Sequence, residues 1–299
     1  MQTIQLSLSP VQASTEENIQ QEVANHLNIA KEQITEIRLL KRSIDARKRK
    51  VKVQLKIEVY INEKAPNFDI ERNYQDVSSK DPVVIVGSGP AGLFAALKLI
   101  ELGKKPIVLE RGKDVQSRRR DLAAINKEHI VNPNSNYCFG EGGAGTYSDG
   151  KLYTRSKKRG SIQSVLETMV FHGAKEDILI DAHPHIGTNK LPKLIADIRE
   201  TILNAGGEIH FNTKVTDFII EKNTIKGVVT ESDEKIEGTA VILATGHSAR
   251  DIFFLLQEKG IAIEGKSFAM GVRIEHPQAL IDQIQYSCTE RSPYLPAAS

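Results

Sequence analysis

One stretch decides the fold of this 299-residue chain: Val83-Val84-Ile85-Val86-Gly87-Ser88-Gly89-Pro90-Ala91-Gly92. Its first four residues are an unbroken apolar run, which is typical of a strand buried on both faces of a parallel sheet. Gly87 permits a tight turn out of the strand, Gly89 leaves the backbone open to a pyrophosphate, and Gly92 lets the next helix pack closely on the strand. The first N–H groups of that helix and its dipole favour a diphosphate. The stretch therefore predicts a dinucleotide-binding strand, turn and helix.

A second strand and a carboxylate complete the unit that this turn begins. The helix is expected to end near Gly103, and residues 106–110 are the next expected strand. Glu110 follows the last glycine by about 20 residues, where a carboxylate can accept hydrogen bonds from both ribose hydroxyls of an adenosine. A carboxylate there disfavours a 2′-phosphorylated adenosine, whereas the neighbouring cation Arg111 favours one. The alternative is a glycine turn of an unrelated α/β protein, and the surrounding strand–helix–strand order argues against it.

The composition excludes several classes of protein. The chain has 40 Lys and Arg against 38 Asp and Glu, a net charge of +2, which excludes a uniformly basic nucleic-acid coat. Hydrophobic residues make up 40% of the chain, which is too many for a disordered protein. Two cysteines, Cys138 and Cys288, cannot form a disulfide framework. The sequence shows neither a secretory signal nor an apolar run long enough to span a bilayer, so we expect a cytoplasmic protein without a membrane partner.

Residues 1–75 are expected to form a small α+β domain. Apolar and polar residues alternate over 51–61, as in a half-buried strand, and weaker strand patterns cover 4–8 and 34–44. Between the strand patterns at 4–8 and 34–44, a Ser-Thr-Glu-Glu stretch at residues 14–17 can cap a helix with apolar residues at helical spacing. This pattern predicts one helix on a small antiparallel sheet, with a ferredoxin-like plait as one arrangement. Residues 62–81 are polar and weakly periodic, which indicates a linker.

The following residues, 76–264, are expected to form an α/β domain. The expected elements are helices at 162–171, 191–203 and 249–258, the last capped by Ser248, and strands at 207–211 and 241–246. Three short strand patterns separated by turn residues predict a β-meander over 214–239. The apolar strand at 241–246 is expected to be buried. Residues 265–299 are expected to begin a further domain, with a strand at 268–274 and a helix at 278–284.

These segments resemble the FAD-binding part of the two-dinucleotide-binding flavoproteins, the glutathione-reductase-like superfamily. The resemblance rests on 84–92 with Ala96, Gly103 and Glu110, and on a meander placed before a strand ending in Ala244-Thr245-Gly246. Within the superfamily, residues 42–48, 139–152 and 183–188 are similar to a bacterial group of uncharacterised FAD-dependent dehydrogenases. The implied fold is α/β: a Rossmann-like FAD-binding domain with a β-meander, preceded by the small α+β domain.

The resemblance also implies which residues hold FAD. The two glycine-rich segments would run past the pyrophosphate and the flavin, the carboxylate after the second strand would hold the ribose, and the first meander strand would meet the adenine. The implied cofactor-binding residues are Gly87, Gly89, Pro90, Ala91, Gly92, Glu110, Arg111, Gly142, Gly143, Ala144, Gly145, Thr146, Val215, Ala244, Thr245 and Gly246. Four glycines within 142–150 are also what a flexible loop would contain.

Cysteine and histidine residues do not give a catalytic centre at this stage. Disulfide reductases of the superfamily carry two cysteines four residues apart, and Cys138 has no such partner. A dithiol mechanism is therefore not expected, and Cys138 is interpreted as a small buried hydrophobe. His183 and His185 can point to one side of an extended segment and move protons, or they belong to a turn made by Pro184 and capped by Thr188. We expect no metal site.

Two basic stretches are interpreted as solvated surface. Residues 41–56 carry eight Lys or Arg against a single Asp, which would also suit an RNA-binding surface. Aromatic side chains that could stack on bases are scarce there, with Tyr60 the nearest. Arg118, Arg119 and Arg120 are expected on the surface of a helix.

The sequence thus predicts an FAD-dependent oxidoreductase of unknown substrate that transfers a hydride through a non-covalently bound flavin, with NAD(P)H as a candidate electron donor. Two alternatives stay open. One is an NAD-dependent dehydrogenase with NAD in the same site, and the other is an RNA-binding or assembly protein that retains a flavoprotein fold. No residue is assigned as a general acid or base.

The C-terminal residues leave the expected fold incomplete. Flavoproteins of the resembled type close the FAD site with a later strand that ends in Gly-Asp, and no Gly-Asp pair follows Gly246. We therefore expect residues 1–299 to be the N-terminal part of a longer protein with a weakened hold on FAD.

Overall fold

A four-stranded parallel sheet with the order β10-β4-β5-β6 forms the core of the α/β domain. The computed structural model describes residues 1–148, 150–154, 160–187, 189–272 and 274–298. The strands are β4 (Pro82–Val86), β5 (Lys105–Leu109), β6 (Glu208–His210) and β10 (Ala240–Leu243). β4 lies between β5 and β10, and its Val83, Val84, Ile85 and Val86 are buried, as the sequence predicts.

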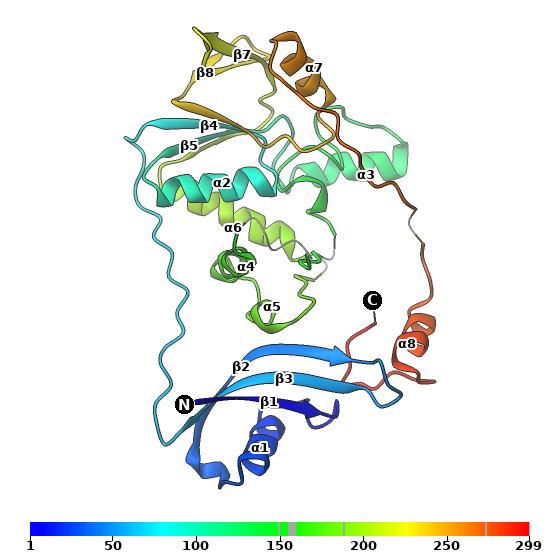
Figure 1. The fold of residues 1–299 in the computed structure, drawn as a ribbon. Helices are drawn as coiled ribbons and strands as arrows, with labels where there is room; N and C mark the ends of the chain where they lie inside the picture. Colours follow the sequence, from blue (N-terminus) through cyan, green and yellow to red (C-terminus); the bar gives the residue numbers. More distant parts are fainter. Residues whose placement is uncertain (149, 155–159, 188, 273, 299) are drawn as a thin grey trace.

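Helices cover one face of this sheet, and an antiparallel meander covers the other (Figure 1). On the helical face, Ile85 shares a buried core with α2 (Pro90–Glu101) and α6 (Leu191–Asn204). On the opposite face, Val84 and Val86 pack with residues of the meander. Alternate residues of one strand therefore bind the two layers together. The predicted α/β fold with a Rossmann-like domain and a β-meander is confirmed.

The meander follows the predicted strand boundaries closely. It consists of β7 (Val215–Glu221), β8 (Thr224–Thr230) and β9 (Lys235–Glu237). Lys222 and Asn223 between the first two strands have positive φ angles of 49° and 62°. Two successive residues with positive φ form the type I′ turn that matches the twist of a tight hairpin.

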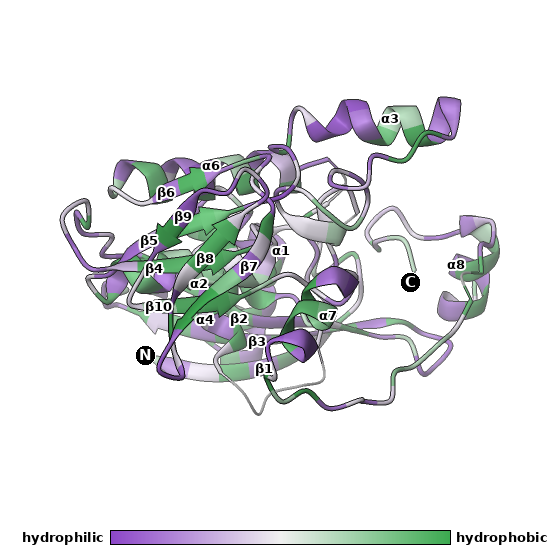
Figure 2. Ribbon diagram, turned by 90° about the horizontal axis from the view of Figure 1, so that it is seen from above, coloured by the Kyte–Doolittle hydropathy of each residue, from purple (hydrophilic) through white to green (hydrophobic). Residues whose placement is uncertain are grey.

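Further helical segments lie between β5 and β6 and after β10 in the chain. They are α3 (Arg118–Glu128), the single turn η2 (Gly143–Gly145), α4 (Ile162–Phe171), α5 (Asp177–Ile180), α7 (Arg250–Glu258) and α8 (Gln278–Tyr286). α3 projects from the body, and much of it is hydrophilic (Figure 2). The predicted Ser248 cap of α7 is wrong, because Ala249 occupies the N-cap position and makes no side-chain hydrogen bond. Among the described residues, no helix is long and apolar enough to cross a membrane.

Two expectations for the C-terminal third are wrong. β10 is an edge strand whose Leu243 is 40% exposed, because β4 is its single partner strand among the described residues. The described residues of segment 268–274 form no strand, and Phe268, Met270 and Val272 are each more than 80% exposed. Alternating apolar residues make a strand only where a neighbouring backbone accepts their hydrogen bonds. Residue 273 lies outside the described residues.

Residues 1–61 form a unit of their own. Its elements are β1 (Gln2–Leu8), α1 (Glu16–Leu27), the short η1 (Lys31–Gln33), β2 (Ile34–Asp45) and β3 (Lys52–Ile61). The sheet is antiparallel in the order β1-β3-β2, and α1 packs on it through Val23 and Ala24. Thr15 caps α1 by accepting the Asn18 N–H, as predicted. The unit has the first four elements, βαββ, of a ferredoxin-like plait, and the chain leaves β3 along irregular residues 62–81.

The N-terminal unit contacts the sheet domain through Arg42 of β2. The Arg42 Nε donates to Asp181 Oδ1 at 2.7 Å, and its Nη2 donates to Asp181 Oδ2 at 3.1 Å and to Asp177 Oδ1 at 3.0 Å. The Ala182 N–H donates to the Arg42 carbonyl at 2.9 Å. The hydrogen bond to Asp181 raises the pKa of Arg42. This charge is therefore engaged within the chain and is not part of a free basic surface.

Candidate functional site

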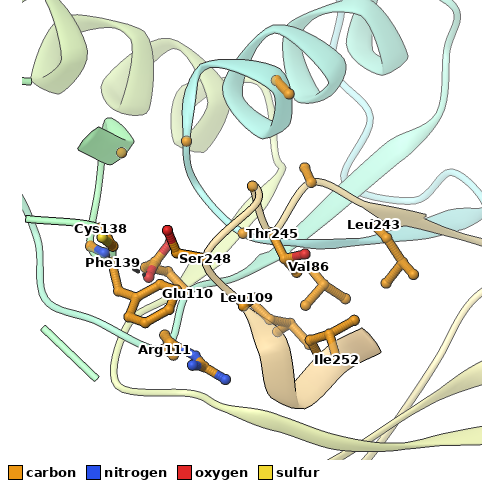
Figure 3. A pocket seen from close by; sticks show the side chains of 18 of the residues that line it. Val86, Leu109, Glu110, Arg111, Cys138, Phe139, Leu243, Thr245, Ser248 and Ile252 are labelled. Carbon is orange, nitrogen blue, oxygen red and sulfur yellow. Dashed lines mark hydrogen bonds between the residues drawn. The ribbon is translucent and has the colours of Figure 1, made fainter. Parts of the chain in front are cut away.

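A cavity of about 330 Å³ lies where the carboxyl ends of β4, β5 and β10 meet. This is the edge at which open α/β sheets bind ligands. In Figure 3, Glu110, Arg111 and Phe139 lie toward one end of it, and Leu243 and Ile252 toward the other. The expected site residues that line it are Gly87, Gly89, Pro90, Ala91, Glu110, Arg111, Gly143, Ala144, Val215, Ala244, Thr245 and Gly246.

Two glycines of the first turn are required by the fold itself. Gly87 has a φ of +106°, and a Cβ there would lie 2.6 Å from the carbonyl oxygen of Ala244. A Cβ on Gly92 would lie 1.9 Å from the carbonyl oxygen of Gly87. Gly92 therefore serves the packing of α2 on β4 and does not line the cavity.

Gly89 differs, because the fold leaves room for a side chain. Its φ of −69° and ψ of −179° are open to any residue, and a Cβ would meet nothing closer than the Gly143 Cα at 3.9 Å. α2 begins at Pro90 without a side-chain cap, so its first N–H groups remain available to another acceptor. Open space beside an uncapped helix N-terminus suits an anionic group such as a diphosphate.

Glu110 is a buried carboxylate that accepts hydrogen bonds from the neighbouring loops. Its Oε2 accepts the Ser88 N–H at 2.8 Å and the Ser88 hydroxyl at 2.9 Å. Its Oε1 accepts the N–H groups of Gly112 at 2.8 Å and Gly140 at 3.0 Å. Two oxygens offer about four acceptor positions, so all of them are used. A ribose hydroxyl that bonds Glu110 must therefore replace one of these donors.

Arg111 lines the cavity with its charge engaged. Its guanidinium lies over the Phe139 ring, 4.5 Å from the centroid, and forms an ion pair with Asp251 of α7. The pair joins the end of β5 to α7. A cation that is already paired is a weaker receptor for a 2′-phosphate than a free one.

Only part of the second glycine-rich segment, residues 142–146, lines the cavity. Gly143 and Ala144 line the cavity, whereas Gly142, Gly145 and Thr146 do not. A Cβ on Gly142 would lie 2.4 Å from Ile195 Cδ1, so this glycine lets the loop pack on α6. Thr146 is 1% exposed and bonds the loop's own carbonyls. Gly145 has open space around it.

The expectation that Arg118 lies on the surface is wrong. Its side chain is 0% exposed, while Arg119 and Arg120 are exposed. The guanidinium donates to backbone carbonyls of the loop that follows α3, among them Asn136 at 2.9 Å and Gly143 at 2.9 Å. An arginine is buried only where enough acceptors converge on it, and no local sequence pattern shows such convergence.

The interpretation of Cys138 as a buried residue is also wrong. The thiol is exposed and lines the cavity next to Phe139. Other lining residues that the sequence analysis did not assign are Val86, Leu109, Gly140, Thr213, Leu243, His247, Ser248, Ala249 and Ile252. Four of these nine residues directly neighbour an assigned residue in the chain and three more lie two residues away, so proximity to the glycine segments and strand ends was the available signal.

Glu141 is a second carboxylate that the sequence analysis missed. It is 0% exposed, and its Oε2 accepts the Val115 N–H at 2.7 Å and a bond from Arg199 of α6 at 2.8 Å. Its Oε1 has no hydrogen-bond partner among the described residues. Burial raises the pKa of Glu141 to about 7, and Arg199 only partly opposes this shift. The carboxyl lies behind the cavity wall and does not line it.

His183 and His185 lie outside the cavity. Both are exposed, and the His183 ring stacks on Tyr153 at a centroid distance of 4.4 Å. Asp149 and Thr188, which belong to the motifs quoted above, lie outside the described residues. Across the described parts of the chain, no group of three or more His, Cys, Asp or Glu side chains could hold a metal ion.

Comparison with known protein families divides the chain into three parts. Residues 80–242 match the family described as FAD binding domain. Residues 1–60 match a domain of unknown function (DUF8436), and residues 267–299 match the family described as FAD-dependent protein, C-terminal domain-like.

Three curated relatives match over different lengths. An uncharacterized protein of Clostridium beijerinckii is 38% identical over 296 residues, which are 94% of this chain and 55% of that protein. A tRNA uridine 5-carboxymethylaminomethyl modification enzyme of Alkaliphilus metalliredigens is 27% identical over 55% of this chain and 24% of the enzyme. A digeranylgeranylglycerophospholipid reductase of Methanosarcina acetivorans is 26% identical over 48% of this chain and 32% of the reductase. The chain thus spans about half the length of the first relative and less of the others.

The solved structures that resemble this chain do so with low TM-scores. Thermovibrio ammonificans THI4 has a TM-score of 0.41 and 17% identity over 62% of this chain and 65% of that one. A ferredoxin reductase from Rhodopseudomonas palustris has a TM-score of 0.28 and 15% identity over 56% of this chain and 24% of that one. The family match over 80–242 covers more than half of the chain. The protein therefore belongs to the FAD binding domain family, and its cofactor is FAD.

Proposed function

We propose that the protein is an FAD-dependent oxidoreductase that moves a hydride between NAD(P)H or an organic substrate and a non-covalently bound flavin. When bound, FAD supplies the hydride chemistry through its flavin ring. The observation that carries the proposal is the open Gly89 turn beside the uncapped start of α2, at the sheet edge where nucleotides bind. The match to a relative named as a reductase supports the reaction class.

The cavity suits the nucleotide half of the cofactor. Its volume of about 330 Å³ is at the lower end of the range for ligand sites. The backbone around Gly89 and Ala91 would hold the diphosphate through N–H groups. Val215, Leu109 and Ile252 supply an apolar lining at which an adenine ring can be buried. Glu110 would keep both glycine segments in place around the ribose.

The site residues favour an adenosine without a 2′-phosphate in this cavity. Glu110 places a buried negative charge at the end of β5, which opposes an added phosphate. Arg111, the neighbouring cation, is paired with Asp251. An electron donor such as NADPH would therefore have to bind elsewhere.

Two measurements on the purified full chain test this proposal. Mass spectrometry of the released cofactor should identify FAD. Under anaerobic conditions, titration with NADH, and separately with NADPH, should bleach the flavin absorbance near ~450 nm. A preparation that contains FAD but is reduced neither by these donors nor by amines, alcohols or hydroxy acids would contradict the oxidoreductase assignment, although not the assignment of the cofactor.

A further inference from the structure

Arg118 gathers the loop after α3 around one buried guanidinium. Its Nε donates to the Asn136 carbonyl at 2.9 Å, and its Nη2 donates to the Tyr137 carbonyl at 3.1 Å. Its Nη1 donates to the carbonyls of Glu141 and Gly143, both at 2.9 Å. A guanidinium offers five N–H groups in a rigid fork, which lets one side chain collect carbonyls from several turns of backbone.

The same loop forms a wall of the FAD cavity. Phe139, Gly143 and Ala144 line it, whereas Arg118 does not. Every peptide bond of the described chain is trans. Because a trans peptide points its carbonyl and the next N–H in opposite directions, the Gly143 carbonyl on Arg118 turns the Ala144 N–H away from Arg118. These carbonyls of the loop thus face the guanidinium, and the N–H that points away from it belongs to Ala144, a residue of the cavity lining.

The position of Arg118 does not stabilise helix α3, to which it belongs. Arg118 is the first residue of α3, where a cation opposes the helix dipole. Its acceptors among the described residues are uncharged carbonyl and hydroxyl oxygens. Gly140 is fitted to it, because a Cβ there would lie 2.5 Å from Arg118 Cδ. The hydrogen bonds to the loop offset the cost of burying this charge, and they order the loop as they form.

We propose that Arg118 is the positioning residue of the FAD site. It folds residues 136–146 so that the Ala144 N–H and the Phe139 ring face the cofactor, and it does not touch the cofactor itself. The proposal rests on FAD binding in this cavity and is independent of the proposed hydride transfer.

The test compares Arg118→Lys and Arg118→Ala with Arg119→Ala in the full chain. Arg119 is the exposed neighbour on the same helix, so its loss changes the net charge equally. Lysine keeps the charge but has three donors on one atom and no fork. Both Arg118 variants should bind FAD about 10- to 100-fold more weakly, measured by quenching of flavin fluorescence, and Arg119→Ala should bind it normally.

Two further readouts separate positioning from general stability. Hydrogen exchange should speed up in residues 136–146 of the Arg118→Lys protein, while strand β3 keeps its protection. Methylguanidinium added to Arg118→Ala should restore part of the FAD affinity by refilling the empty site. The proposal is overturned if Arg118→Lys binds FAD and exchanges like the wild type, or if Arg119→Ala loses as much affinity. Should Arg118→Ala fail to fold, the comparison of Arg118→Lys with Arg119→Ala decides alone.

Discussion

Glu110 and Arg118 form hydrogen bonds with the N–H and the carbonyl of the same residue, Gly140. The Glu110 carboxylate accepts the Gly140 N–H at 3.0 Å, and the Arg118 guanidinium donates to the Gly140 carbonyl at 3.3 Å. Glu110 also accepts two bonds from Ser88 in the first glycine turn. Two buried, opposite charges thereby fix the distance between the two glycine segments that enclose the cavity.

Replacing Gly89 with Val should abolish FAD retention without unfolding the protein. The backbone at Gly89 accepts any residue, and a Cβ meets nothing closer than 3.9 Å, so the new side chain fills only the space of the ligand. The expected loss of FAD affinity is about 100-fold or more, measured by fluorescence titration. The control is Gly92→Ala, whose Cβ would meet the Gly87 carbonyl at 1.9 Å and should lower the Tm. A Gly89→Val protein that stays fully loaded would refute this assignment.

Glu110→Gln should destabilise the fold even without FAD. The carboxylate accepts four hydrogen bonds, and an amide would turn its NH₂ group toward two of the donors. Hydrogen bonds to a charged group contribute about 1.5–3 kcal/mol each, so we expect a loss of roughly 3 kcal/mol in the free energy of unfolding, measured with urea. The exposed Glu258→Gln is the matched control. Equal stability of the two variants would show that Glu110 does not brace the loops.

The pH dependence of stability should contain a contribution from Glu141. Burial raises the pKa of its carboxyl to about 7 in the folded protein, above its value in the unfolded chain. The folded state binds this proton more tightly, so the free energy of unfolding should fall as the pH rises from about 4.5 to about 7 and then level off. The contribution is on the order of 3 kcal/mol.

Glu141→Gln isolates that contribution, because the amide stays uncharged. Urea unfolding from about pH 5 to about pH 8 should show a shallower fall for this variant than for the wild type. Glu200→Gln removes the exposed carboxylate that also lies near Arg199, and it should keep the wild-type slope. Identical slopes for wild type and Glu141→Gln would mean that Glu141 does not titrate in this range.

Arg42→Ala should loosen the N-terminal unit from the sheet domain. The side chain bonds Asp181 and Asp177 but is 35% exposed, so solvent screening limits its contribution to about 1 kcal/mol. Chymotrypsin should then cut the 62–81 segment faster, for instance at the exposed Phe68. Arg47→Ala is the control, since Arg47 pairs with Asp45 in its own hairpin. Unchanged cleavage would show that the contact does not hold the two parts together.

FAD should protect Cys138 from alkylation. The thiol is exposed and lines the cavity, so a bound nucleotide would cover it and slow its reaction with iodoacetamide severalfold. Cys288, in the C-terminal segment, serves as the internal control in the same sample. Peptide mass spectrometry with and without added FAD measures both rates. Equal protection of the two thiols, or none, would place FAD elsewhere.

The order of strands and helices could be predicted well, because each depends on short-range patterns. The alternation over β3 and the turn residues of the meander identified these elements. The strand expected at 268–274 failed for the opposite reason: its alternation is present, but the described residues offer it no partner strand. Pairing is a property of distant backbone, and the local pattern does not contain it.

By itself, the sequence determined the glycine-rich turn after β4 and the order of strands and helices in the FAD domain. The requirements at Gly87, Gly89 and Gly92 are met within a few residues of chain. Only the tertiary structure decided that Arg118 is buried, that Cys138 is exposed to the cavity, and that the Glu110 acceptors are all engaged. The energy of a buried charge depends on which distant dipoles converge on it, and that convergence exists only once the loop has folded back onto α3.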